Sequence, residues 1–175
     1  MSGMGSTPWL TRREERAWRA LQFMQLRVEG ELTRQLHAES ALSYPDYLVL
    51  VALTDRPDGR LRLFELASVL GWEKSRVSHQ VTRMADRALV VKERCDTDRR
   101  GAFVVITNKG RREIEAAAPG HVAAVRRVFV DRLTPQQLDA VADAAQAVLA
   151  GFDEVQPSAT EPVTRDGAGS PMSLR

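Results

Sequence analysis

Residues 61–112 read LRLFELASVLGWEKSRVSHQVTRMADRALVVKERCDTDRRGAFVVITNKGRR. Within this stretch Ala67 is followed by Gly71 and then by Val77. Two short helices that cross at a tight turn need this spacing. A small residue lies where the axes touch, a glycine can take positive φ in the turn, and a β-branched residue seals the second helix. The pattern predicts a helix-turn-helix.

The second helix of this motif is expected to run from about Glu73 to Arg87 and to bury Val77, Val81 and Met84. Polar side chains then form its exposed face: Lys74, Ser75, Arg76, Ser78, His79, Gln80 and Arg83. Their hydroxyl, amide and guanidinium groups suit base edges and phosphates, and the N-terminal half of such a helix reaches bases in the major groove. The alternative is a solvated amphipathic face that binds nothing.

After this helix, residues 89–94 and 102–107 are two β-rich runs that predict a hairpin. The polar loop between them holds Asp96, Asp98, Arg99 and Arg100. A narrow minor groove has an enhanced negative potential, so Arg100 is the candidate for insertion there, with Arg99 near the DNA backbone. Asp98 or Asp96 is expected to stabilise the loop by pairing with an arginine. The alternative is an exposed Asp98–Arg99 ion pair of little energetic worth.

Three segments of this region carry a family resemblance. Residues 70–81 (LGWEKSRVSHQV), 98–101 (DRRG) and 106–111 (ITNKGR) resemble the multiple-antibiotic-resistance regulator (MarR) family, and the likeness extends over residues 11–152. It implies a homodimeric winged-helix transcription factor, often a repressor that a small molecule releases from DNA. Ala88 stands where the family usually has glycine. An αL cap there would be strained with alanine, which leaves a different exit into the wing open.

The polar side chains of the second helix divide by chemistry into two predicted roles. The base readers are Arg76, His79 and Gln80, and the residues that mainly position the helix on phosphates are Lys74, Ser75, Ser78 and Arg83. The binding partner is then a near-palindromic double-stranded operator, because two recognition helices of a dimer read two half-sites.

Basic charge is concentrated in the same region. The chain has 175 residues and a net charge of +2, yet residues 60–112 hold 13 Lys and Arg against 6 Asp and Glu. The rest of the chain holds 12 against 17. This segregation favours nucleic acid over an acidic small substrate and predicts strongly salt-dependent binding.

Long helices are expected on both sides of the winged motif. Thr11 and Glu14 predict a capping box that opens the first, whose apolar stripe is Trp18, Leu21, Met24, Val28, Leu32 and Leu36. Ser43 and Pro45 open the next helix, and Arg56-Pro57-Asp58-Gly59 ends it. Thr107 can cap a third, which Pro119-Gly120 must bend or break, and Thr134-Pro135-Gln136-Gln137 opens a last one.

The expected fold is therefore mainly α with a small antiparallel β wing (α+β), a winged helix-turn-helix flanked by long N- and C-terminal dimerisation helices. Residues 1–10 form an arm. Residues 11–153 form one domain, in which 11–40 and 108–153 dimerise and 44–107 bind DNA. Residues 154–175 are Pro-, Gly-, Ser- and Thr-rich and predict a disordered tail. The alternative to a dimer is that the long helices only close their own core.

The resemblance also implies a cleft for a small aromatic or anionic ligand. Its candidate lining is Trp18, Met24, Arg27, His37, Tyr44 and Tyr47. Aromatic and methionine residues at helical spacing are equally typical of plain core, so the stripe alone does not establish a site.

Several classes of protein are not supported. There is no phosphate-cradling glycine loop, no metal-ligand spacing and no nucleophile with its base, so we expect no enzyme, no cofactor and no metal. The single Cys95 excludes an intramolecular disulfide. We expect a structural or incidental cysteine and assign no peroxide sensor; the alternative is that oxidation of this thiol moves the wing. The absence of a long apolar run and of a signal-peptide core predicts a cytoplasmic protein without membrane contact. The remaining alternative is a winged-helix protein-interaction module, whose helix should instead expose aromatic or aliphatic anchors.

Overall fold

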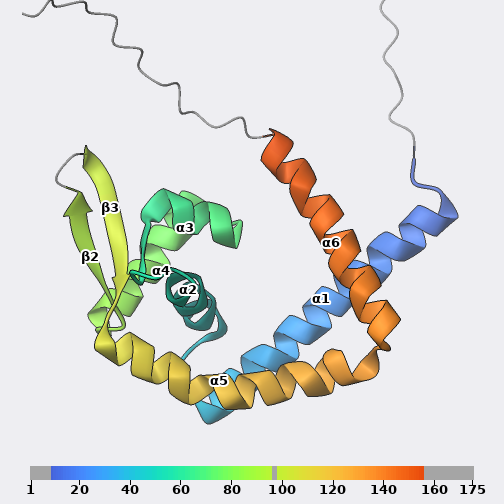
Figure 1. The fold of residues 1–175 in the computed structure, drawn as a ribbon, viewed down its shortest axis with the longest axis horizontal. Helices are drawn as coiled ribbons and strands as arrows, with labels where there is room; N and C mark the ends of the chain where they lie inside the picture. The colour runs from blue at the N-terminus through green and yellow to red at the C-terminus, as the bar shows by residue number, and fades with distance from the viewer. Residues whose placement is uncertain (1–8, 96–97, 156–175) are drawn as a thin grey trace, which may run out of the picture. The chain divides into compact units, whose positions relative to one another are not determined.

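A computed structural model of the chain describes residues 9–95 and 98–155 (Figure 1). Two compact units are distinguished, one ending at Arg132 and the other beginning at Leu133. The first unit contains α1 (Arg12–Glu39), α2 (Tyr44–Thr54), β1 (Arg60–Arg62), α3 (Leu63–Leu70), α4 (Lys74–Asp86), β2 (Val90–Cys95), β3 (Asp98–Ile106), α5 (Asn108–Val128) and the 3-10 turn η1 (Val130–Arg132). The second contains α6 (Pro135–Val155).

The long helices begin where their capping residues predict. At the start of α1, Thr11 Oγ1 accepts from the Glu14 amide at 3.3 Å and Glu14 Oε2 accepts from the Thr11 amide at 2.7 Å. Ser43 and Thr134 make the same reciprocal arrangement at α2 and α6. Thr107 caps α5. Each cap satisfies backbone N–H groups that have no partner inside the helix, and this fixes where the helix starts.

The core of the first unit lies between α2, α3, α4 and the sheet, with the β2–β3 hairpin on its flank (Figure 1). Its fully buried side chains include Leu50, Leu53, Leu66, Val77, Val81, Met84, Val90 and Val104. Burying one such side chain stabilises the fold by roughly 1.5–3 kcal/mol. Val77, Val81 and Met84 are the three residues that the sequence assigned to the buried face of the recognition helix, so that prediction is confirmed.

The sheet has three antiparallel strands in the order β1-β3-β2. The sequence did not indicate β1, which is only three residues long and pairs with β3. The tip of the hairpin also differs from expectation. Residues 98–101 belong to β3 rather than to a loop, and residues 96–97, with the predicted role of Asp96, lie outside the described residues.

Register explains how the tip is accommodated. Arg94 pairs with Ala102, whereas the adjacent Cys95 pairs with Asp98. Residues 99–101 are therefore additional on β3, as in an enlarged β-bulge. A bulge changes the direction of the strand at Arg99 and Arg100, of which the sequence assigns Arg100 to the minor groove and Arg99 to the DNA backbone.

The turn between α3 and α4 has the predicted glycine geometry. Gly71 has φ of 61° and ψ of 30°, and the Trp72 amide donates to the Ala67 carbonyl at 3.0 Å. Only glycine takes this left-handed conformation without strain from a Cβ atom. The helix-turn-helix is thereby confirmed.

Ala88 adopts the same left-handed conformation at the exit from α4, with φ of 58°. The Leu89 amide donates to the Met84 carbonyl at 2.9 Å, so the helix ends as it would with a glycine cap. Thr107 Oγ1 supports the exit by donating to the Ala88 carbonyl at 2.7 Å. The alanine therefore does not redirect the chain, and the strain of its Cβ atom remains in the fold.

We expect Ala88→Gly to stabilise the protein by about 0.5–1 kcal/mol, because the relief of left-handed strain exceeds the added entropy of the unfolded chain. Urea unfolding followed by circular dichroism measures the difference. The control is Ala85→Gly one turn earlier in α4, which should destabilise by about 1 kcal/mol. Equal losses for both variants would contradict the assignment of strain to Ala88.

Helix α5 continues without a break through Pro119, so of the two outcomes expected at Pro119-Gly120, a bend or a break, the break does not occur. Pro119 is exposed, and Gly120 faces α1, where an added Cβ atom would lie 2.5 Å from Glu39 Oε2 and 3.0 Å from Gln35 Nε2. Packing of α5 along α1 thus offsets the loss of one backbone hydrogen bond at the proline.

Candidate nucleic-acid interface

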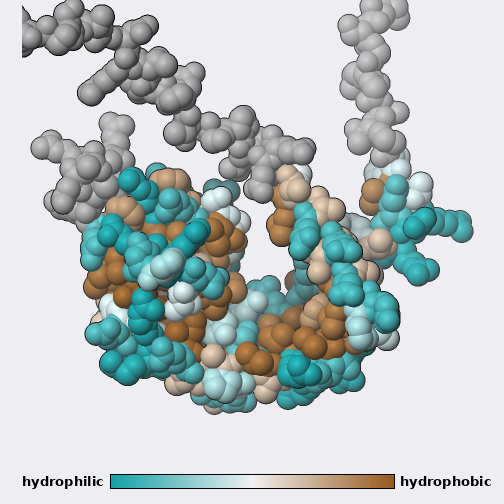
Figure 2. All heavy atoms as spheres, viewed as in Figure 1, coloured by the Kyte–Doolittle hydropathy of each residue, from teal (hydrophilic) through white to brown (hydrophobic). Residues whose placement is uncertain are grey.

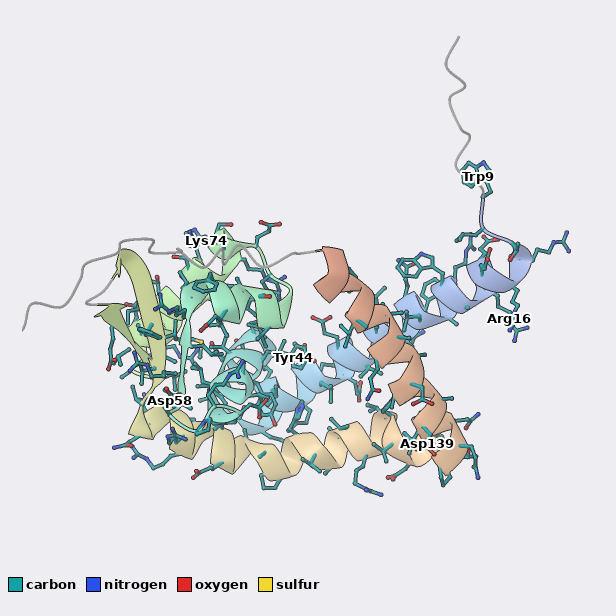
Figure 3. The ribbon with its side chains drawn as sticks, turned by 45° about the horizontal axis from the view of Figure 1, so that its top comes forward. Trp9, Arg16, Tyr44, Asp58, Lys74 and Asp139 are labelled. Atoms are coloured by element: carbon teal, nitrogen blue, oxygen red, sulfur yellow. The ribbon has the colours of Figure 1, made fainter. Side chains whose placement is uncertain are left out.

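Helix α4 exposes most of the polar face that the sequence predicts. Lys74, Ser75, Arg76, His79 and Arg83 are exposed and Ser78 is half-buried. Lys74, at the start of the helix, points away from the body of the first unit (Figure 3). Within the described part of the chain the Glu73 side chain makes no capping bond to this helix. The first-turn amides of α4 are therefore available to an anion such as a phosphate.

Arg76 has a partner that the sequence analysis missed. Its guanidinium lies 4.2 Å from the centre of the Trp72 ring, and Trp72 is itself packed against the core. A cation over an aromatic face is held electrostatically, and stacking limits the number of rotamers that the arginine visits. The spacing of four residues between Trp72 and Arg76, which lies across the start of α4, was the sequence signal for this contact.

Gln80 does not belong to the exposed polar face of α4 that the sequence predicts. Its side chain is only 2% exposed, and Nε2 donates to Asp46 Oδ1 at 2.6 Å. The expectation that it faces solvent and reads a base is wrong. The amide finds a buried carboxylate on α2, and a buried polar group gains more from a partner than it would lose by leaving water.

Asp46 of α2 binds two side chains of the α4 region, Gln80 within the helix and Arg87 just after its end. It is 1% exposed, and its Oδ2 accepts from the Ser43 amide at 2.9 Å and from Arg87 Nη1 at 2.6 Å. Arg87 also donates to the Ala41 carbonyl. The sequence showed Asp46 only as a residue near a helix start. Its contacts with Gln80 and Arg87 form only when α2 and α4 are packed together.

The wing is connected to α4 as well. Lys92 Nζ of β2 donates to Thr82 Oγ1 at 2.7 Å. On the sheet, the guanidinium of Arg60 lies 3.8 Å and that of Arg62 5.0 Å from the centre of the Phe103 ring. Both arginines lie on the strand that the sequence did not predict. The side chains of Asp98, Arg99 and Arg100 lie outside the described residues, so their roles stay predictions.

The predicted ligand residues do not form one cluster. Trp18, Met24, Arg27 and His37 are all exposed on α1. Tyr44 and Tyr47 on α2 instead lie near His121 of α5, with ring centres 6.4 and 4.1 Å from the imidazole. Burial lowers the pKa of His121 and raises the pKa values of both tyrosines, so all three are held in their neutral forms.

Arg27 lines a different feature, an open groove of about 490 Å³ between α1, α5 and η1. The groove is rich in guanidinium groups and has two valines, its lining being Arg27, Val28, Glu31, Arg34, Arg127, Val128 and Arg132. Glu31 pairs with Arg34 and, at 3.6 Å, with Arg127. Four cationic groups against one carboxylate make the groove suited to an anion.

The described residues contain neither a metal site nor a membrane-spanning helix. No group of three or more His, Cys, Asp or Glu in that part of the chain could hold a metal ion. Among the helices described, none combines the length and apolarity that a membrane crossing requires.

Comparison with known proteins identifies the fold. The profile of the MarR family matches residues 42–101, which include α2, the helix-turn-helix and most of the wing. The crystal structure of AbsC, a MarR family transcriptional regulator from Streptomyces coelicolor, is 37% identical, with 85% of this chain and 99% of that chain covered and a TM-score of 0.76. The chain belongs to the MarR family.

Two other members with solved structures are similar to this MarR family chain. Sco3205 from Streptomyces coelicolor, crystallised in complex with DNA, is 36% identical, with 88% and 95% of the two chains covered and a TM-score of 0.78. CouR from Rhodococcus jostii RHA1, bound to p-coumaroyl-CoA, is 25% identical, with 74% and 88% covered and a TM-score of 0.65. Among curated proteins, none matches the chain.

Membership settles the general function. The protein is a DNA-binding transcriptional regulator of the winged helix-turn-helix class, and it is not an enzyme. The resemblance that residues 70–81, 98–101 and 106–111 indicated is confirmed, as is the mainly helical fold with an antiparallel wing.

Proposed function

We propose that the protein is a homodimeric repressor that binds a near-palindromic operator in the cytoplasm. Each protomer inserts α4 into a major groove and its wing into the flanking minor groove. The observation that carries the proposal is the start of α4, where uncapped backbone amides lie beside the exposed Lys74, Ser75 and Arg76. This arrangement suits a phosphate at the helix N-terminus and a base edge next to it.

For the side chains of α4, the proposed roles take their exposure into account, and the roles at the tip of the wing are those expected from the sequence. Arg76 and His79 read bases, and Lys74, Ser75, Ser78 and Arg83 contact phosphates. Arg100 enters the minor groove, Arg99 lies near the backbone, and Asp98 stabilises the tip. Gln80 is removed from the set of base readers because of its burial.

Apolar surface on three helices supports the dimer. On α1, Trp18, Phe23 and Leu26 are 52%, 66% and 67% exposed. On α6, the large exposed residues are Val141, Val148, Leu149 and Phe152. Apolar surface is also visible over the second half of α5 (Figure 2), where Val122 is 55% exposed. Exposed apolar side chains in such number on a helix are typical of a protein interface.

Charge supports a pairing of α1 of one protomer with α6 of the other. The first eight residues of α1 carry four arginines against Glu14 and Glu15, an excess of two positive charges, whereas α6 has four acidic residues and no basic one. We propose that residues 11–40 and 108–153 dimerise and that residues 44–107 form the DNA-binding lobe. Opposite charge steers such an encounter and fixes its register.

A small anionic ligand is proposed to release the operator. The arginine-lined groove suits its charged end, and the neutral cluster of Tyr44, Tyr47 and His121 suits an aromatic ring. CouR is bound to an aromatic acyl-CoA, so p-coumarate and p-coumaroyl-CoA are suitable first probes. Release of a labelled operator by either compound, at concentrations that leave random DNA bound, would support ligand control.

A protein-interaction module remains the second candidate, and one observation favours it. Phe64 and Val69 on α3 are 60% and 56% exposed, and such side chains can anchor a protein partner. This module would bind no DNA sequence preferentially.

The deciding experiment is a selection from random duplexes, followed by fluorescence anisotropy at two salt concentrations. We expect one near-palindrome to be enriched and its affinity to fall steeply with salt. Arg100→Ala should weaken binding to it about tenfold, and Arg99→Ala less, because a guanidinium in a narrow groove gains more from the local potential. If no sequence is enriched, the protein-interaction module is favoured.

A further inference from the structure

We propose that buried Asp46 and Gln80 hold the Arg83 guanidinium in place for its contact with a DNA phosphate. Both would be positioning residues, since neither reaches the surface. The inference rests on the proposed function and adds to it, because it gives two buried side chains, one of them on α2, a role in the contact of Arg83 with DNA.

The three side chains form a continuous chain of hydrogen bonds. Gln80 Nε2 donates to Asp46 Oδ1 at 2.6 Å, and Gln80 Oε1 accepts from Arg83 Nη2. Asp46 and Gln80 are 1% and 2% exposed, whereas Arg83 is exposed on the face of α4 that carries Arg76 and His79. The chain thus leads from the first turn of α2 to the surface of the recognition helix.

The direction of each bond is fixed by chemistry. A carboxylate only accepts, so Gln80 must turn its NH₂ group toward Asp46 and its carbonyl oxygen the other way. Asp46 cannot rotate freely, because Oδ2 is held by the Ser43 amide and by Arg87. Gln80 Oε1 therefore has one available orientation, and in it the oxygen meets Arg83.

The benefit for binding is preorganisation. An exposed arginine loses rotamer entropy when it is fixed on a phosphate, and immobilising such a side chain costs about 0.5–1.5 kcal/mol. An arginine that is already held loses less of this freedom. Since every DNA site offers phosphates, the gain should apply to operator and random duplexes alike.

A double-mutant cycle with Gln80→Met and Arg83→Met tests the inference. Methionine nearly conserves the volume of glutamine and removes both hydrogen bonds. By anisotropy we expect Gln80→Met to weaken binding about fivefold and Arg83→Met about tenfold. The double variant should be no weaker than Arg83→Met, on operator and on random duplex.

The matched control is the cycle of Gln80→Met with Arg76→Ala. Arg76 lies over Trp72 and makes no bond to Gln80 among the described contacts, so these two losses should multiply. Losses that multiply for Gln80 and Arg83 would overturn the inference while leaving the proposed function intact. If the wild-type protein binds random duplex and no sequence is enriched, the operator proposal is overturned. The double-mutant cycle on random duplex then still tests the inference about Arg83. Absence of any DNA binding would overturn both.

A second measurement needs no substitution at a buried site. In the wild-type protein without DNA, the Arg83 Nε–Hε group should show a heteronuclear NOE close to that of the backbone. The exposed Arg12 and Arg13 are the reference for mobile side chains. An Arg83 signal as mobile as theirs would contradict the proposal even if Gln80→Met does not fold. Arg87→Met should lower stability, because it removes the ion pair with Asp46 and the hydrogen bond to the Ala41 carbonyl. The Ser43 amide still holds Asp46 Oδ2 in this variant, so the coupling between Gln80 and Arg83 should persist.

Discussion

Gly110→Ala is expected to destabilise the first unit by about 3 kcal/mol, which corresponds to a fall in melting temperature of about 10 °C. A Cβ atom built on Gly110 would lie 2.2 Å from the Leu89 carbonyl oxygen and 3.0 Å from Ile106 Cγ1. The first contact is with backbone, so no side-chain rotation can relieve it. The start of α5 would have to move away from the base of the wing.

That movement would disrupt several interactions at once. The Thr107 amide donates to the Leu89 carbonyl at 3.1 Å, and Thr107 Oγ1, which donates to the Ala88 carbonyl, lies 3.1 Å from the same Leu89 oxygen. Thr107 also caps α5 by accepting from the Gly110 amide, so displacement of the helix weakens its N-cap. The higher helix propensity of alanine, worth about 1 kcal/mol, offsets only part of this loss.

Differential scanning calorimetry, with Gly30→Ala as the control, separates the steric clash at Gly110 from the gain in helix propensity that alanine brings. Gly30 lies inside α1, and an added Cβ atom there would be 3.8 Å from Arg34 Nη1, which is an ordinary contact. Gly30→Ala should therefore stabilise by about 0.5–1 kcal/mol. If both alanine variants gained stability, the close approach of α5 to Leu89 would be wrong.

Arg76→Ala is expected to weaken binding to the operator by about 10- to 100-fold and to relax the preference at one base position, because a good bidentate base contact contributes roughly 1–3 kcal/mol of discrimination. The Trp72 ring holds the guanidinium beside the first turn of α4. Binding to random duplex should change much less, since Arg76 is assigned to a base and not to a phosphate.

Lys74→Ala is the comparison for Arg76→Ala. Lys74 lies at the first position of α4 and points outward (Figure 3), where it meets a phosphate in the proposed complex. Its loss should weaken all sequences about equally and reduce the slope of log affinity against log salt by about one. Anisotropy on operator and random duplex at several salt concentrations measures both variants. Equal losses on both duplexes for Arg76→Ala would contradict its role as a base reader.

The predictions that succeeded from sequence were those governed by local rules. Thr11, Ser43, Thr107 and Thr134 cap helices because a hydroxyl three residues before a free amide satisfies it in any fold. Gly71 marks the turn because only its backbone takes positive φ freely. Helical periodicity similarly identified Val77, Val81 and Met84 as the buried side of the recognition helix.

The predictions that failed required knowledge of neighbours in space. Gln80 looks like a surface residue by type, and only the packing of α2 against α4 brings Asp46 to it. The short strand β1 has too few residues for a pattern, and its existence depends on pairing with β3. Pro119-Gly120 predicts a bend or a break, and contact of α5 with α1 prevents the break by keeping the helix continuous.

The sequence by itself determined the helix ends, the turn, the apolar faces and the family, since these depend on hydrogen bonds and periodicities within a few residues. Tertiary structure alone decided which polar side chains of α4 remain exposed. A helical position is exposed or buried according to what packs against it, and Gln80 and Arg83, three residues apart on α4, differ because α2 supplies a carboxylate to one and solvent surrounds the other.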